Sequence, residues 1–157
     1  MTEPIDFISA TDRPALIAFN TPDWLDTAKS ALEELNYKVH TAATHGDFQT
    51  RFTRICYEVV VLEELFCASV LAENQTVNWL QRMPMTQRRH STIIMVGESF
   101  QTFNAMQAFQ QSVHVVVNSS EMFLLRQLIE KAVSDNNLFL SNLRETQARI
   151  YAGKTRD

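Results

Sequence analysis

Apolar runs of strand length alternate with amphipathic stretches along most of this chain. The run at residues 59–62 is four consecutive aliphatic residues, which fits a strand of a parallel sheet covered by helices on both faces. Similar runs lie at residues 15–19, 37–41, 92–96 and 113–117. Five strand–helix repeats predict an α/β domain at residues 14–134, a doubly wound five-stranded parallel sheet. The run at 37–41 alternates polar and apolar residues, so we expect an edge strand there.

Local signals place the helices between these strands. Thr21, Pro22 and Asp23 predict the start of the first helix, with a hydroxyl residue at the N-cap, proline at the first helical position and an acid in the first turn. Apolar residues in 77–83 indicate a short helix. Residues 85–90 predict a polar loop that carries arginines.

The last helix continues past the point at which the predicted domain ends. Its apolar stripe keeps a spacing of three or four residues through Met122, Leu125, Ile129, Ala132, Asn136, Phe139, Leu143, Thr146 and Ile150. We therefore expect a helical extension at residues 135–157 that pairs with a partner, as in a coiled coil, with Asn136 fixing the register. A broader packing surface fits the stripe equally well, and a helix folded back on its own domain is the alternative. Pairing between chains is favoured because a compact domain has no spare face for four further turns.

The composition describes an ordinary soluble globular domain with one core. The net charge of -4 gives no support for binding nucleic acid or anionic membranes. Residues 1–13 form a polar N-terminal arm without a signal-peptide pattern. Cys56 and Cys67 are too few for a disulfide scaffold, so we expect a cytoplasmic protein in which both are small apolar fillers.

No residue pattern in the chain indicates catalysis. His40, His45, His90 and His114 have no metal-ligand spacing with one another or with the cysteines, and we expect them at the surface or half-buried. Only three glycines are present, and neither a phosphate-binding loop nor a nucleophile elbow can be found. We therefore expect no catalytic residue, no metal, no cofactor and no enzymatic activity.

The residues that follow the predicted strands carry a family resemblance. Asn20 and Thr21 follow the first strand, Glu63 the third, Gly97 the fourth and Asn118 the fifth. The order and lengths of the elements resemble the receiver domain of two-component response regulators. That resemblance implies acidic magnesium ligands after the first strand, a phosphoaccepting aspartate after the third, Ser or Thr after the fourth and Lys after the fifth. At each of these positions this chain has a different residue.

These departures predict a degenerate receiver that has lost its phosphorylation site. Magnesium is usually bound through carboxylates, and Asn20 and Thr21 supply only neutral oxygens. Asn118 cannot neutralise a phosphoryl group as a lysine does. Glu63 is then either a fixed negative charge where the family keeps a switch, or an ordinary solvated carboxylate at a strand end.

We therefore predict a non-catalytic signalling module that binds protein partners and forms a homodimer. The predicted interface combines the helix expected around Phe103 and Met106, the helix expected from Ser119 onward, and the extension. Its residues are Phe103, Met106, Met122, Leu125, Ile129, Asn136, Phe139, Leu143 and Ile150. The alternative function is the binding of a small molecule or nucleotide at the carboxyl ends of the strands. The crevice for it would be bounded by Asn20, Glu63, Gly97 and Asn118.

Overall fold

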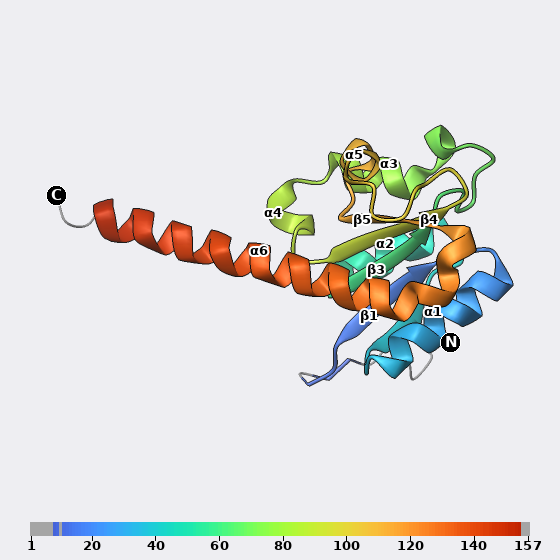
Figure 1. The fold of residues 1–157 in the computed structure, drawn as a ribbon, viewed down its shortest axis with the longest axis horizontal. Helices are drawn as coiled ribbons and strands as arrows, with labels where there is room; N and C mark the ends of the chain where they lie inside the picture. Colours follow the sequence, from blue (N-terminus) through green and yellow to red (C-terminus); the bar gives the residue numbers. More distant parts are fainter. Residues whose placement is uncertain (1–7, 10, 155–157) are drawn as a thin grey trace.

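A five-stranded parallel sheet forms the centre of the structure, a computed structural model that describes residues 8–9 and 11–154 (Figure 1). The strand order is β2-β1-β3-β4-β5, so β3 is central and β2 lies at an edge, as predicted. The strands are β1 (Pro14–Ala18), β2 (Lys38–Thr41), β3 (Val59–Glu63), β4 (Thr92–Gly97) and β5 (Val115–Asn118). Most of the predicted N-terminal arm and residues 155–157 lie outside the described residues.

Helices cover both faces of this sheet, which confirms the doubly wound α/β fold. They are α1 (Pro22–Glu34), α2 (His45–Arg54), α3 (Gln75–Arg82), α4 (Met85–Arg88), α5 (Ala105–Gln111) and α6 (Leu125–Lys154), with short 3-10 turns at η2 (Leu71–Glu73) and η3 (Ser119–Leu124). Successive strand residues point to opposite faces. Ala15 and Ile17 of β1 therefore pack in one core with residues of α1 and α6, and Leu16 and Ala18 pack in a second core with residues of α2, α3 and α5.

The short helix α4 replaces the polar loop predicted for residues 85–90. Pro84 occupies its N-cap, and the side chain of Arg88 is buried rather than solvated. Arg88 Nη1 donates a hydrogen bond to the carbonyl of Ser112, at the end of α5, over 3.0 Å. Burial of this guanidinium lowers the pKa of Arg88. The prediction was wrong because one arginine of the segment packs against the body.

The first helix begins where the sequence predicted, but Thr21 does not cap it with its side chain. Pro22 is the first residue of α1 and Asp23 lies in its first turn. The hydroxyl of Thr21 donates to Glu63 instead of accepting from the helix. By contrast, Thr44 at the start of α2 accepts from the backbone N–H of Asp47 over 3.1 Å, as an N-cap normally does. A carboxylate within reach thus changes the role of Thr21.

Helix α6 is a single unbroken helix of 30 residues, about 45 Å long, and its second half projects from the body (Figure 1). It crosses the predicted boundary at residues 134 and 135 without interruption. Leu140 is still buried against the body, so the docked part of the helix extends beyond the predicted domain end. The free part of the extension is correspondingly shorter than residues 135–157.

Asn136 binds its own domain and not a second helix. Its Nδ2 donates to Thr92 Oγ1 over 3.1 Å and to the carbonyl of Arg89 over 3.3 Å. The side chain is buried, at 6% exposure. The predicted role of Asn136 in the register of a coiled coil is therefore wrong, because the amide is already used to attach α6 to the start of β4.

Three further side chains differ from the prediction in their burial. Cys56 and Cys67 are exposed free thiols rather than apolar fillers. His40 on the edge strand β2 is fully buried and shares a hydrogen bond of 2.7 Å between its Nδ1 and the hydroxyl of Tyr57. Among the described residues, no helix has the length and apolar character needed to cross a membrane.

We expect the substitution Asn136→Ala to lower the free energy of unfolding by about 1–3 kcal/mol. It removes the amide that satisfies the buried Thr92 hydroxyl and the Arg89 carbonyl. Chemical denaturation followed by circular dichroism would measure the change. Asn137→Ala is the matched control, since Asn137 lies next to it on the exposed face of α6. Equal losses for the two variants would contradict the anchoring role of Asn136.

Candidate functional site

A cavity of about 650 Å³ lies at the carboxyl ends of β1, β3 and β4. Parallel strands end at the same edge of a sheet, so the residues that follow them meet there. Asn20 and Thr21 come from the loop between β1 and α1, Glu63 is the last residue of β3, and Gly97 is the last residue of β4. The cavity is lined by Asn20, Thr21, Pro22, Trp24, Glu63, Glu64, Leu65, Gly97, Glu98 and Ser99.

The carboxylate of Glu63 is buried at the base of this cavity and is bound on both oxygens. Its Oε2 accepts a hydrogen bond from the backbone N–H of Asn20 over 2.8 Å, and its Oε1 accepts from the hydroxyl of Thr21. The residue is only 5% exposed. Both donors lie at the N-terminus of α1, where the helix dipole also favours a negative charge. Glu63 is therefore not a solvated carboxylate at a strand end.

Asn20 connects Glu63 to two further loops. Its side-chain Oδ1 accepts from the backbone N–H of Cys67 over 2.7 Å, and its Nδ2 donates to the carbonyl of Ala43 over 3.3 Å. The loops after β1, β2 and β3 are thus joined through one neutral amide. The backbone N–H of Asn20 thus donates to the Glu63 carboxylate, and its side-chain oxygen Oδ1 is already bound to Cys67.

Glu64 occupies the space next to Gly97. A Cβ atom at position 97 would lie 2.6 Å from the Cβ of Glu64, which is too close for any side chain without movement. The backbone N–H of Glu64 donates to the Val96 carbonyl over 2.8 Å, and its Oε1 accepts from the N–H of Ser99 over 3.3 Å. Glycine at this position is required by the packing of Glu64, which leaves no room for a hydroxyl residue.

Asn118 does not line the cavity, so the predicted crevice is wrong at this residue. Its Nδ2 donates to the Phe100 carbonyl over 2.7 Å, and its Oδ1 accepts from the backbone N–H of Ser120 over 2.9 Å. These bonds attach the loop between β4 and α5 to the start of η3. Thr102 in the same loop donates to Glu121 Oε1 over 2.8 Å, which holds that loop from a second point. The structure brings together the other four predicted positions and turns Asn118 away.

The predicted set did not include six residues that line the cavity: Pro22, Trp24, Glu64, Leu65, Glu98 and Ser99. Glu64 follows Glu63 at the strand end, so its approximate place could have been inferred. Trp24 lies in the first turn of α1, which begins at the same edge of the sheet. No signal in the sequence shows that Trp24 lines the cavity.

Every ionisable residue that lines the cavity is acidic. Glu63, Glu64 and Glu98 contribute carboxylates, and none of the described lining residues is basic. Within residues 8–9 and 11–154, no group of three or more His, Cys, Asp or Glu side chains is arranged to hold a metal ion. A phosphate or nucleotide would meet three carboxylates and no basic side chain of the described lining here. The geometry therefore disfavours the nucleotide-binding alternative.

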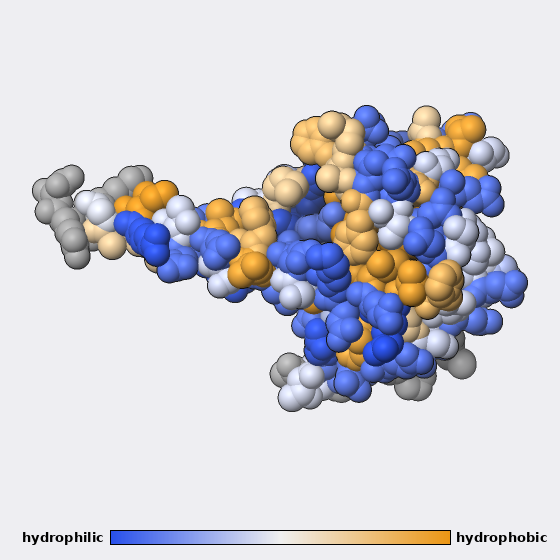
Figure 2. Space-filling view, viewed as in Figure 1, coloured by the Kyte–Doolittle hydropathy of each residue, from blue (hydrophilic) through white to orange (hydrophobic). Residues whose placement is uncertain are grey.

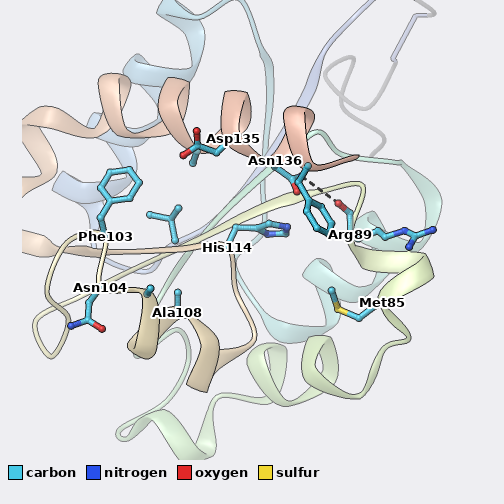
Figure 3. Close-up of a pocket in the computed structure, with 12 residues that line it drawn as sticks. Met85, Arg89, Phe103, Asn104, Ala108, His114, Asp135 and Asn136 are labelled. Carbon is cyan, nitrogen blue, oxygen red and sulfur yellow. Dashed lines mark hydrogen bonds between the residues drawn. The ribbon is translucent and has the colours of Figure 1, made fainter. Parts of the chain in front are cut away.

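A second hollow, which we call the α5–α6 groove, lies between α5, α6 and the start of β5 and has a volume of about 430 Å³ (Figure 3). Phe103, Ala108 and Phe139 supply apolar walls, and His114 and Asn136 supply polar groups. Figure 3 shows Asn136 on α6 above His114, with its hydrogen bond to the Arg89 carbonyl drawn as a dashed line.

The predicted interface residues separate into two groups around this groove. Met122, Leu125 and Ile129 are buried in the core of the domain, so no partner can reach them and their assignment to an interface is corrected. Spacing alone did not distinguish them, because a helix has the same periodicity on its own sheet as on a partner. The remaining predicted residues other than Asn136 are accessible: Phe103 and Leu143 are half-buried, and Met106, Phe139 and Ile150 are exposed.

Comparison with solved structures shows the CheY-like receiver fold, here with a long C-terminal helix added. The chemotaxis response regulator CheY4 of Vibrio cholerae has a TM-score of 0.60 and 12% identity, with 78% of this chain and 99% of that chain covered. A CheY-like receiver domain protein of Methanospirillum hungatei JF-1 has a TM-score of 0.62 and 16% identity, covering 81% and 98%. A structure of adenylate cyclase from Rhodopirellula baltica is also similar, at a TM-score of 0.63 and 14% identity, covering 87% and 98%.

The sequence matches no protein-family model and no curated protein. At the identities of the structural neighbours, the likeness concerns the fold alone. The chain thus has a receiver-like fold.

We expect Glu63→Ala to destabilise the fold by about 1–3 kcal/mol, because it leaves the Asn20 N–H and the Thr21 hydroxyl without their acceptor. Glu98→Ala is the matched control, since Glu98 lines the same cavity with an exposed side chain. Urea unfolding of the three proteins would measure the difference. A loss for Glu98→Ala as large as that for Glu63→Ala would show that the bonds to Glu63 have no special weight.

We expect His114 to make the stability depend on pH between 6.5 and 4. Burial, and secondly the charge of Arg88, lower the pKa of His114 from 6.5 to about 4, although Asn136 partly offsets them. The unfolded chain therefore binds a proton that the folded chain does not, and this contribution is present above pH 6.5 and lost as the pH falls toward 4.

The wild-type protein should lose up to about 1.4 kcal/mol per pH unit more than His114→Gln across that window. Calorimetric unfolding of both proteins at several pH values would give the difference. Parallel stability curves would contradict the lowered pKa of His114.

Proposed function

We propose that this protein is a receiver-like signalling module that works without phosphorylation or other chemistry, through contacts with protein partners and as a homodimer. The single observation that carries the proposal is the binding of both Glu63 oxygens by Asn20 and Thr21. Glu63 stands at the position that resembles the phosphoacceptor. Here its carboxylate is committed to holding the β1–α1 loop.

Each requirement of carboxylate phosphorylation meets an obstacle in this site. A phosphoryl group needs a cation to neutralise its oxygens, usually magnesium held by carboxylates together with a basic side chain. Asn20 and Thr21 direct hydrogen-bond donors toward Glu63, and Asn118 points to the Phe100 carbonyl. A receiver would have a Ser or Thr at the position of Gly97, and here Glu64 fills the space that such a side chain would occupy.

The same bonds support a module with one fixed state. The loop between β4 and α5 is held at Phe100 by Asn118 and at Thr102 by Glu121. Both oxygens of the Glu63 carboxylate are already engaged by donors of the β1–α1 loop. A partner would therefore recognise a constant surface.

An apolar surface beside α5 and α6 supports the contact function. Phe109 is 80% exposed, Met106 64% and Phe139 58%. Large apolar side chains that gather at the surface typically mark a site of protein–protein contact. The projecting part of α6 adds a helix with an apolar stripe, which supports the homodimer.

The phosphorylation-independent state can be tested with beryllofluoride and magnesium, which together imitate a phosphorylated carboxylate. We expect no saturable change in the amide NMR signals of Asn20, Glu63 or Gly97, because Asn20 and Thr21 supply no carboxylate for magnesium and Asn118 supplies no basic side chain for the phosphoryl analogue. A receiver domain with an aspartate at the phosphoacceptor position, under the same conditions, is the positive control. The variant Glu63→Asp should also remain silent, since Asn20 and Asn118 are unchanged in it.

Saturable shifts centred on Glu63 in the wild-type protein would refute the loss of the switch. Shifts in Glu63→Asp alone would show that the surrounding site still binds the phosphoryl analogue. In that case the replacement of aspartate by Glu63 would alone explain the loss of phosphorylation. The absence of a basic side chain from the described cavity lining would then not prevent binding of the phosphoryl analogue.

A further inference from the structure

The apolar stripe of α6 is covered by the body in its first half and exposed in its second. Ile129 is fully buried, whereas Phe139 is 58% exposed and Ile150 is 54% exposed. Figure 2 shows hydrophobic residues both on the body and along the helix that projects from it. The exposed stretch from Phe139 to Ile150 is about 17 Å long. The same stripe thus continues past the point where its own domain can cover it.

This exposed stripe is continuous with the α5–α6 groove. Phe139 lies in the stripe and also lines the groove, together with Ala108 and Met85 from the body. Within residues 8–9 and 11–154, α6 is unbroken and runs away from the body, so the helix does not fold back over either surface (Figure 1). One chain therefore presents an apolar helix tip and, beside the root of that helix, an apolar groove.

A parallel pair of helices explains this arrangement poorly. In parallel pairing, identical residues face each other, and a buried Asn pair would fix the register. The Asn136 amide is already bonded to Thr92 and Arg89 within its own chain. Parallel pairing would also face Thr146 with Thr146 and leave only about two heptads to hold the dimer, which is short for an isolated helix pair.

An antiparallel pair uses both surfaces. With the two-fold axis between residues 144 and 145, Phe139 of one copy meets Ile150 of the other, and Leu143 meets Thr146. Each of these contacts occurs twice. The tip of each helix then runs back along the root of the other helix and across its groove, so the groove and the stripe are covered by the same partner.

The charge distribution favours a second copy as the occupant of the groove. Residues 141–157 contain four basic and two acidic residues, whereas the whole chain has a net charge of -4. The acidic excess is therefore in the body as a whole, while the groove itself carries one acidic and one basic residue, Asp135 and Arg89, and Asp135 is paired with Lys131 over 3.2 Å. A basic helix tip and an acidic body attract each other across a two-fold interface, and they do so in both directions.

We propose that two copies of this chain pair antiparallel through α6, with the tip of each helix seated across the α5–α6 groove of the other. This pairing rests on the homodimer of the proposed function and specifies its geometry. It makes Phe139 and Ile150 a contact pair between chains, and it leaves the cavity at Glu63, at the other end of the strands, outside the interface.

Cysteine cross-linking tests the pairing. In the background Cys56→Ser and Cys67→Ser, both exposed in the wild type, Phe139→Cys and Ile150→Cys proteins with tags of different size would be co-expressed and oxidised. We expect the mixed disulfide between positions 139 and 150 as the main product on a non-reducing gel. Phe139→Cys combined with Ala148→Cys, on the outer face of α6, is the matched control and should give little product. Light scattering on the unmodified protein should give twice 18.0 kDa.

The outcomes separate the pairing from the homodimer itself. A disulfide between two Ile150→Cys chains would overturn the antiparallel pairing in favour of a parallel one, while the homodimer would stand. A dimer by light scattering without any cross-link through α6 would overturn the pairing and place the interface elsewhere. A monomeric mass at all concentrations would overturn both. Positions 139, 148 and 150 are exposed, so the substitutions leave the folded core intact.

Discussion

The carboxylate of Glu63 joins the end of the central strand to the beginning of the first helix, and the edge of the sheet that would carry a function is arranged around it. A buried carboxylate is tolerated only when hydrogen bonds replace the water it has lost. Asn20 and Thr21 provide those bonds from the N-terminus of α1. Because Asn20 also holds Cys67 and Ala43, the position of three loops depends on this one buried charge.

The loop after β4 is held in a similar way but by neutral groups. Asn118 binds the Phe100 carbonyl with one end of its amide and the start of η3 with the other. Glu64 fills the space over Gly97, which explains the glycine without any need for backbone flexibility. The positions that resemble the reactive residues of a receiver are thus used to connect loops, which is the physical basis of the proposed phosphorylation-independent function.

The apolar stripe of α6 is buried in the core of the domain in its first half and exposed in its second half. Its first half completes the core of the domain, and Asn136 marks the region where the body ends. Beyond Leu140 the same stripe continues to Ile150, whose side chain is exposed. The helix is unbroken from Leu125 to Lys154, so the buried and the exposed parts of the stripe belong to one continuous element.

The sequence by itself determined the fold class, the central place of residues 59–62, the edge position of β2 and the meeting of Asn20, Thr21, Glu63 and Gly97 at one end of the sheet. These follow from apolar runs and from the rule that parallel strands end at a common edge, and neither depends on the details of side-chain packing.

Only the tertiary structure decided which way individual side chains turn. Asn118 is the last residue of β5 but its side chain turns away from the cavity, and the Thr21 hydroxyl binds a carboxylate rather than its helix. Leu125 and Ile129 share the spacing of Phe139, yet they are buried where it is exposed. The reason is that a periodic apolar spacing shows only that one face of the helix is apolar. How far the folded domain extends along the helix determines which residues of that face the domain covers.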